Sequence, residues 1–269
     1  MAEAGTVFLM YHELADPGRA LCNADAGYTR YVVPAAEFGK QMERLARQGW
    51  TGKTVSQAMQ SFDGKSVCIT FDDGSESDLL YAAPALEHVD FKATFYITAG
   101  FVGKPGYLSE SQLRDLNALG FEIGCHSMTH PYLTDINHRQ LQEETKGAKD
   151  RLEQIIGAGV GHFSCPGGRW NQSVVDAVKA SGFKTMATSR TGVNLAGTNP
   201  FALARFAVLE NTSMDVLMRA CRGQGLLRTQ LQEKVRDAIK SVVGNSAYDS
   251  LRALMLGRNR KSSSESHHL

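Results

Sequence analysis

Short apolar runs alternate with amphipathic helical patterns along the first 210 residues of the chain. Seven of the runs have the length and composition of buried strands, and they cover residues 7–11, 67–71, 93–98, 121–125, 162–165, 184–188 and 202–208. Helical patterns fill the intervals at residues 35–48, 79–88, 109–119, 139–156 and 171–181. Because strands that alternate with helices form parallel sheets, the pattern predicts an α/β fold, a distorted (β/α) barrel of about seven parallel strands.

The composition fits a globular protein of this size. The chain has 269 residues, of which 42% are hydrophobic, and barrels of this kind commonly have about 250 residues. A formal net charge of +1 argues against nucleic acid as the main partner. The five cysteines form no CxxC pair, which is typical of a reducing compartment rather than of a disulfide framework.

The first residues of the chain carry no recognisable export signal. Residues 1–14 lack a basic region followed by a long apolar stretch, so no signal peptide is expected. No apolar run approaches the roughly 18 residues of a membrane span. These features predict a cytoplasmic protein, which could also lie at the periphery of the inner membrane.

The last fifth of the chain is strongly basic. Residues 219–261 hold ten Lys or Arg and three acidic residues, a formal net charge of +7. Hydrophobic residues from Leu227 to Val242 recur at helical spacing. We therefore predict a barrel at residues 1–210, a basic helical extension at 211–261 and a disordered tail at 262–269. The extension would pack on the barrel, or dock on an acidic partner or an anionic membrane surface.

Chemically active side chains follow two of the predicted strands. Asp72 and Asp73 come directly after the run at 67–71, and His126 and His130 follow the run at 121–125. Taken alone, an Asp-Asp-Gly sequence is also an ordinary turn. The carboxyl ends of barrel strands meet at one face, and a catalytic zinc takes three nitrogen or oxygen ligands. One aspartate and both histidines would provide them, which leaves the second aspartate as a base and predicts a metal-assisted hydrolase.

These motifs resemble those of the polysaccharide deacetylase family, the NodB-homology domain. The sequence TFDDG at residues 70–74 matches the first motif of the family, and HSMTH at 126–130 matches the second. The sequence FSCPGG at 163–168 is similar to the third motif, which forms one wall of the substrate groove. The resemblance spans about residues 5–210 and is nearest to the branch found with bacterial exopolysaccharide synthesis.

The resemblance implies a role for each motif residue. Asp73, His126 and His130 would bind a divalent metal ion, usually Zn²⁺. Asp72 would be the general base that takes a proton from the attacking water. A backbone N–H near Gly167 would stabilise the oxyanion, since a fixed donor lowers the energy of the charge that develops there.

The chain departs from the family at the third motif. Family members often have an arginine where this chain has Ser164, and that arginine pairs with the base. Arg169 or Arg205 could supply the same charge from elsewhere. Together with Pro166, Gly167 and Trp170, both arginines are our candidates for substrate binding.

A second departure concerns the general acid. The last motif of the family contains a histidine, but this chain has none between His162 and His267. His12 follows the first predicted strand at the end where a barrel gathers its catalytic groups, so we predict that it donates the proton to the leaving amine. Glu13, or another carboxylate, could orient the ring and raise its pKa.

The sequence thus favours an enzyme that removes acetyl groups from N-acetylated sugars of a bacterial polysaccharide or its precursor. Such an enzyme is a hydrolase of carbon–nitrogen bonds other than peptide bonds, and its partner is an acetylated oligo- or polysaccharide. Two alternatives remain open: a carbohydrate-binding relative that has lost turnover, and a hydrolase of small cyclic amides or imides. The presence of Asp72 favours an enzyme, because a binding module has little need of a base beside the metal.

Overall fold

A ring of seven parallel strands forms the centre of residues 5–226, 230 and 231, which are the residues that the computed structural model describes. The strands are β1 (Gly5–Tyr11), β5 (Ser66–Phe71), β6 (Thr94–Ile97), β7 (Glu122–Cys125), β8 (His162–Ser164), β9 (Thr185–Ala187) and β11 (Phe206–Ala207). The first six pair side by side in chain order. Each strand overlaps one of the seven apolar runs, and the predicted α/β barrel is confirmed.

The segment that contains β11 closes the ring. Phe206 pairs with Leu9 of β1 in parallel register, while Leu203 forms a parallel bridge with Ala187 of β9. The amide N–H of Leu203 donates to the carbonyl oxygen of Met186 at 3.0 Å. Residues 203–207 therefore lie between the first and the last strands of the sheet.

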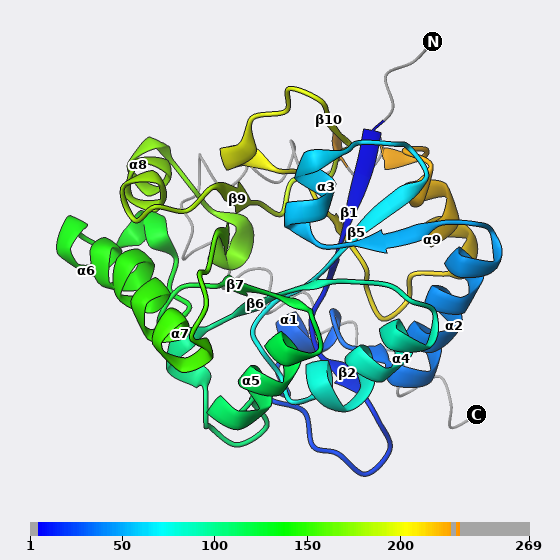
Figure 1. Cartoon of the computed structure of the whole chain (residues 1–269), viewed down its shortest axis with the longest axis horizontal. Helices are drawn as coiled ribbons and strands as arrows, with labels where there is room; N and C mark the ends of the chain where they lie inside the picture. Colours follow the sequence, from blue (N-terminus) through cyan, green and yellow to red (C-terminus); the bar gives the residue numbers. More distant parts are fainter. Residues whose placement is uncertain (1–4, 227–229, 232–269) are drawn as a thin grey trace, which may run out of the picture.

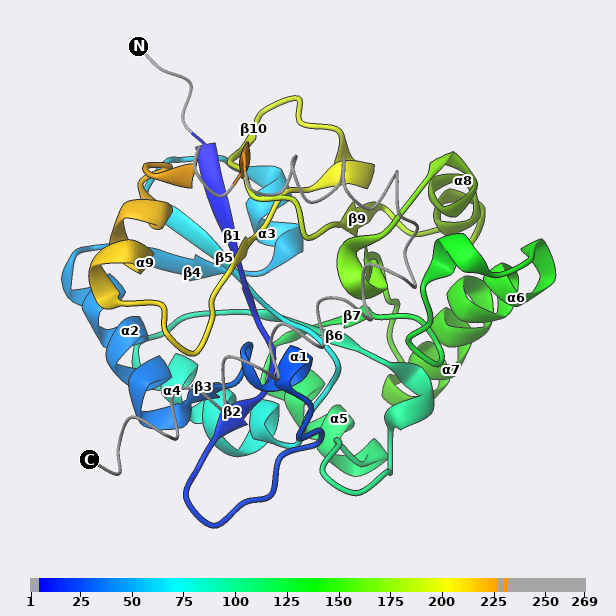
Figure 2. The same ribbon diagram turned by 180° about the vertical axis from the view of Figure 1, so that it is seen from behind.

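Helices surround the ring, as Figures 1 and 2 show from opposite sides. The predicted helices correspond to α2 (Ala35–Arg47), α4 (Ala83–His88), α5 (Glu110–Ala118), α7 (Ala148–Ile156) and α8 (Gln172–Ala180). Each packs an apolar stripe inward, and α2 buries Phe38, Met42 and Leu45. Two of these helices are extended at their amino ends by π-helical segments, η1 (Asp78–Ala82) before α4 and η4 (Glu143–Gly147) before α7, and α6 (His138–Gln142) precedes η4.

Several short elements were not anticipated from the sequence. They are α1 (Ala26–Thr29), α3 (Val55–Gln60), α9 (Met214–Cys221), β2 (Leu14–Ala15), β3 (Val33–Pro34), β4 (Thr51–Lys53), β10 (Asn194–Leu195) and 3₁₀ turns at Ala99–Phe101, Leu133–Asp135, Pro166–Gly168 and Pro200–Ala202. Strands of two or three residues and helices of about one or two turns are too short to produce a reliable periodic pattern.

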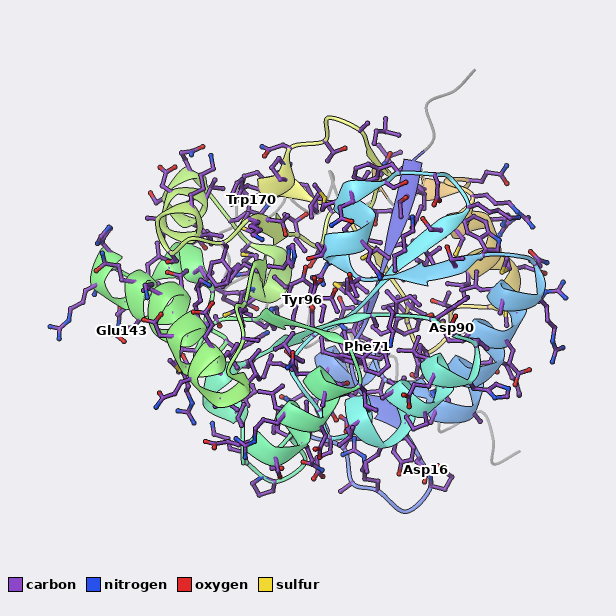
Figure 3. All side chains as sticks on the ribbon, in the orientation of Figure 1. Asp16, Phe71, Asp90, Tyr96, Glu143 and Trp170 are labelled. Carbon is purple, nitrogen blue, oxygen red and sulfur yellow. The ribbon has the colours of Figure 1, made fainter. Side chains whose placement is uncertain are left out.

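Helix α3 covers the amino-terminal end of the barrel, where it lies across the strands in Figure 1. A capping box formed by Thr54 and Gln57 begins this helix. Val55 and Ala58 pack on buried residues of several strands, among them Phe8 and Tyr96, and Tyr96 lies near the centre of the molecule in Figure 3. Side chains therefore fill this end of the barrel.

A partly buried polar network links α3 to the strands. The Glu122 carboxylate accepts hydrogen bonds from the Ser56 amide and the Thr94 hydroxyl and lies 3.3 Å from Nε2 of His162. His162 in turn contacts the hydroxyls of Ser56 and Thr185. Burial would raise the pKa of Glu122, but the hydrogen bond and the charge of His162 outweigh it, with help from Ser56 and Thr94, and the pKa falls to about 2.

We expect this network to make the fold sensitive to acid. The folded-state pKa of Glu122 lies below the ordinary value of 4.5, so its carboxylate stabilises the fold above about pH 4.5 and loses that contribution as the pH falls toward 2. Thermal unfolding should therefore be measured at pH 7 and at pH 3. The unfolding temperature should fall less between these two pH values for Glu122→Gln than for the wild type. Glu110→Gln, at an exposed helical position, is the control, and equal falls in all three proteins would contradict the prediction.

The basic segment is only partly described. Helix α9 packs on β1 and buries Leu217 and Met218. The predicted helix that begins near Leu227 lies outside the described residues except for Gln230 and Leu231, so its docking on an acidic partner or a membrane stays a prediction. Among the described residues, the helices are all too short or too polar to cross a bilayer.

Candidate active site

The two aspartates lie in a sharp turn at the carboxyl end of β5. Asp73 and Gly74 both have left-handed backbone conformations, with φ of 81° and 84°. The amide of Asp72 donates to the carbonyl oxygen of Tyr11, and the carbonyl oxygen of Asp73 accepts from the amide of Thr98. Because neighbouring strands hold the turn on both sides, the two carboxylates have defined positions before any ligand binds.

The two histidines lie in a second turn, after β7. Ser127 and His130 are also left-handed, with φ of 65° and 62°. The amide of His126 donates to the carbonyl oxygen of Ile97 at 2.8 Å, and the amide of His130 donates to the Ser127 hydroxyl. This turn places both imidazoles beside the Asp73 carboxylate.

Asp73, His126 and His130 form the cluster that the sequence predicts. Oδ1 of Asp73 lies 3.5 Å from Nε2 of His126 and 3.6 Å from Nε2 of His130, and one ligand atom from each residue lies within 4.8 Å of the others. Nδ1 of His126 is 2.9 Å from the carbonyl oxygen of Ser164. A carbonyl can only accept, so Nδ1 carries the proton and Nε2 presents its lone pair to Asp73.

The cluster fits a divalent cation better than it fits a hydrogen-bonded group. Oδ1 of Asp73 is buried and has no hydrogen-bond partner among the described residues, and its distances to the imidazoles exceed normal hydrogen-bond lengths. Burial lowers the pKa of His126 to about 4, although Asp72 acts in the opposite direction, so the ring is neutral near pH 7. One carboxylate oxygen and two neutral imidazoles are a donor set suited to zinc, with a position left for water or substrate.

Asp72 lies beside this cluster, with Oδ2 3.9 Å from Nε2 of His126, and forms a two-pronged ion pair with Arg205. Nη1 and Nη2 of Arg205 donate to the two carboxylate oxygens at 2.7 and 2.8 Å, and Nη2 also donates to the Ser164 hydroxyl at 2.8 Å. Asp72 and Arg205 are only 2% and 1% exposed. Of the two arginines considered from the sequence, it is therefore Arg205 that supplies the charge beside Asp72, next to Ser164.

The ion pair fixes the charge of Asp72. Burial alone would raise the pKa of this carboxyl, but the Arg205 guanidinium and the nearby His126 hold it well below its usual range. Asp72 is thus an anion at any pH near neutrality. The sequence also suggested that Arg205 binds substrate, whereas the structure buries its guanidinium behind Asp72, where it has no exposed surface to offer a sugar.

His12 lies at the same end of the barrel, near the two aspartates. Its ring lies against that of Tyr31, with centroids 4.6 Å apart and planes tilted by 35°, and its Nδ1 is buried without a hydrogen-bond partner among the described residues. Burial lowers the pKa of His12, while the charges of Asp73 and Asp72 oppose the shift. Near pH 7 the ring is therefore neutral, and it must gain a proton before it can donate one.

The suggested pairing of His12 with Glu13 is wrong. Both residues lie between β1 and β2, and the Glu13 carboxylate is bound elsewhere. It accepts hydrogen bonds from the Cys22 amide and the Tyr28 hydroxyl and forms an ion pair with Arg19. Glu13 thus holds the segment from residue 16 to residue 31 against the barrel. That segment supplies Tyr31, which contacts His12 and which no local pattern in the sequence indicated.

The predicted substrate loop follows β8. Pro166 is buried, whereas Gly167 is exposed and left-handed, with φ of 60°. A Cβ atom on Gly167 would lie 2.7 Å from the Tyr132 ring, so this close contact requires glycine. The Arg169 guanidinium lies 3.6 Å from the centre of the same ring, and Trp170 lies beside Arg190. Of these loop residues only Gly167 is exposed, Arg169 and Trp170 are half-buried, and Pro166 is buried.

Comparison with known proteins agrees with this geometry. Residues 60–186, which include both ligand turns, match the family model described as polysaccharide deacetylase. The chain belongs to the polysaccharide deacetylase family. Within this family it is similar to the Bacillus subtilis protein YxkH, which carries the same family name. The two are 28% identical over 206 residues, 74% of this chain and 70% of that one.

Two further relatives extend the comparison. The chitooligosaccharide deacetylase of Azorhizobium caulinodans is 32% identical over 126 residues, which are 46% of this chain and 58% of that enzyme. The chain therefore spans under two thirds of that relative. BC0361, a polysaccharide deacetylase from Bacillus cereus, has a crystal structure that superposes with a TM-score of 0.72 at 25% identity, over 81% of this chain and 69% of that one.

Proposed function

We propose that this deacetylase is a metal-dependent hydrolase that removes acetyl groups from N-acetylated sugars of a bacterial polysaccharide or its precursor. The observation that carries the proposal is the unpartnered, buried Oδ1 of Asp73 between Nε2 of His126 and Nε2 of His130. The similarity to a chitooligosaccharide deacetylase supports an N-acetylated sugar as the substrate. The intact ion pair of Asp72 with Arg205 supports turnover rather than binding alone.

The residues divide the reaction between them. Asp73, His126 and His130 would hold a divalent ion, most suitably Zn²⁺, which lowers the pKa of water and polarises the acetyl carbonyl. Asp72, kept ionised by Arg205, accepts the proton of the attacking water. A carboxylate with so low a pKa is a weak base. Asp72 can therefore accept this proton only because the divalent ion would lower the pKa of the water.

The remaining steps need an oxyanion donor and a proton for the amine. A carbon–oxygen bond to water forms and the carbon–nitrogen bond breaks, which releases acetate and the free amino sugar. The backbone N–H near Gly167 is the proposed donor to the oxyanion, and Arg169 and Trp170 would line the sugar on that side. His12 is the proposed source of the proton for the leaving nitrogen, once the ring has been protonated.

Release of acetate from N-acetylglucosamine oligomers tests the proposal. We expect acetate to form with the zinc-loaded protein, to stop after treatment with a chelator, and to resume when zinc is restored. Binding of the oligomers without acetate release would favour the carbohydrate-binding alternative. Hydrolysis of a cyclic imide without release of acetate from any sugar would favour the third possibility.

The role of His12 can be tested by comparing the effect of His12→Ala on substrates with different leaving groups. His12→Ala should leave the zinc content unchanged and lower turnover of N-acetyl sugars by about 10²–10⁴-fold. It should spare an activated aryl acetate, whose leaving group needs no proton. His138→Ala, at an exposed helical position, is the control. Unchanged amide turnover in His12→Ala would remove His12 from the mechanism.

A further inference from the structure

We propose that Glu144 is a positioning residue, which holds the turn of His126 and His130 in its metal-binding shape before the ion arrives. The inference rests on the metal site of the proposed function. Oε2 of Glu144 accepts hydrogen bonds from the amides of Met128 and Thr129 at 2.9 and 2.8 Å. Oε1 accepts from the Thr129 hydroxyl at 2.5 Å. One side chain thus binds the middle of the turn through three donors, and it is 7% exposed.

The turn requires such support because its backbone is unfavourable. Ser127 and His130 are not glycines, yet both are left-handed, a conformation that persists only where surrounding contacts impose it. The carbonyl oxygens of Ser127 and Met128 accept from the amides of Ala99 and Gly100, so the turn is held from one side by the residues after β6. Glu144 binds the amides of Met128 and Thr129, which leaves the turn between two sets of hydrogen bonds.

The helix that carries Glu144 has an uncommon geometry at this point. Glu144 lies in the π-helical segment η4, although the sequence pattern there predicts one regular helix over residues 139–156. Isolated π-helical turns occur frequently at functional sites. A Cβ atom on Gly147 would lie 3.8 Å from Cε of Met128, so this segment packs directly on the histidine turn.

Two substitutions separate the hydrogen bonds of Glu144 from its charge. In Glu144→Gln the amide oxygen can still accept from both backbone amides, and the Thr129 hydroxyl can accept from the side-chain amide, so only the charge is lost. In Glu144→Asp the charge remains, but the carboxylate is one methylene shorter and no longer reaches the turn. If Glu144 acts as a positioning residue, Glu144→Gln should preserve the affinity for zinc and Glu144→Asp should not.

The experiment is a zinc titration of the full chain against a competing chromophoric chelator. We expect Glu144→Asp and Glu144→Ala to weaken zinc binding by about 10–100-fold, as is usual when a group that orients a metal ligand is removed. Glu144→Gln should bind zinc nearly as the wild type does. Glu143→Ala is the matched control, since Glu143 lies in the same π-helical segment with its side chain on the outer surface (Figure 3).

The outcomes distinguish this inference from the proposed function. A wild-type protein that binds no zinc would overturn the metal site itself. Wild-type affinity in both Glu144→Asp and Glu144→Ala would overturn the role of Glu144 alone. Weak binding by Glu144→Gln together with normal binding by Glu144→Asp would show that the charge acts and not the hydrogen bonds. Thermal unfolding of the metal-free variants identifies any that fail to fold. Among the folded variants, the zinc affinities of Glu144→Asp and Glu144→Gln then decide whether the hydrogen bonds or the charge of Glu144 matter.

Discussion

Asp72→Asn is expected to lower turnover by about 10²–10⁴-fold while the protein keeps its zinc, because the substitution removes the proposed general base without touching a proposed metal ligand. The Asn side chain keeps one oxygen for Arg205, so the guanidinium retains part of its hydrogen bonding. The charge of Arg205 is nevertheless left buried without a counter-ion, and we expect the unfolding temperature of Asp72→Asn to fall as well. Acetate release should therefore be measured well below that temperature, beside the zinc content of the same sample.

Asp73→Asn is the control for this experiment. It also replaces a carboxylate by an amide, but this carboxylate lies between the two imidazoles. Asp73→Asn should therefore lose bound zinc, whereas Asp72→Asn should not. If Asp72→Asn lost the metal and Asp73→Asn retained it, the two aspartates would have exchanged the roles assigned to them. Retention of full turnover by Asp72→Asn would exclude it as the base.

Asp73→Ala and His130→Ala are expected to remove both the bound metal and the activity. A catalytic zinc site with three protein ligands loses one third of its donors in either variant, and the remaining pair cannot maintain the usual coordination. Elemental analysis after dialysis should show about one zinc per wild-type chain and little in either variant. Acetate release should fall with the metal content.

His88→Ala is the matched control, because this histidine is exposed at the end of α4, remote in sequence from both ligand turns. It should retain zinc and turnover. Full zinc content in both Asp73→Ala and His130→Ala would contradict the assignment of the ligands.

The barrel could be predicted because its signals are local. Each strand is an apolar run that must be buried on both faces, and each amphipathic helix between two strands must cover the sheet. The closing strand β11 was found for the same reason, although only two of its residues pair regularly. The short elements that shape the rest of the molecule, such as α3, depend on tertiary contacts and produce no periodic pattern.

The cluster of Asp73, His126 and His130 could also be predicted, because each motif directly follows a strand. The carboxyl ends of parallel strands meet at one face, so Asp73 and the two histidines had to come together once the barrel was correct. The cation that pairs with Asp72 could not be predicted in this way. Arg169 and Arg205 were equally eligible from the sequence, and only the fold brings Arg205 to Asp72 across 133 positions of chain.

The sequence by itself determined the barrel and brought the two aspartates and the two histidines to one end of it, since these follow from strand periodicity and strand ends; the proposed division of the aspartates into ligand and base came from the resemblance of the motifs to the family. Only the tertiary structure decided the surroundings of those groups. It turned Glu13 away from His12 and placed Tyr31 on that ring, and it put Glu144 beneath the histidine turn. The physical reason is that pKa values and backbone strain depend on packing between distant segments, which no local pattern of residues encodes.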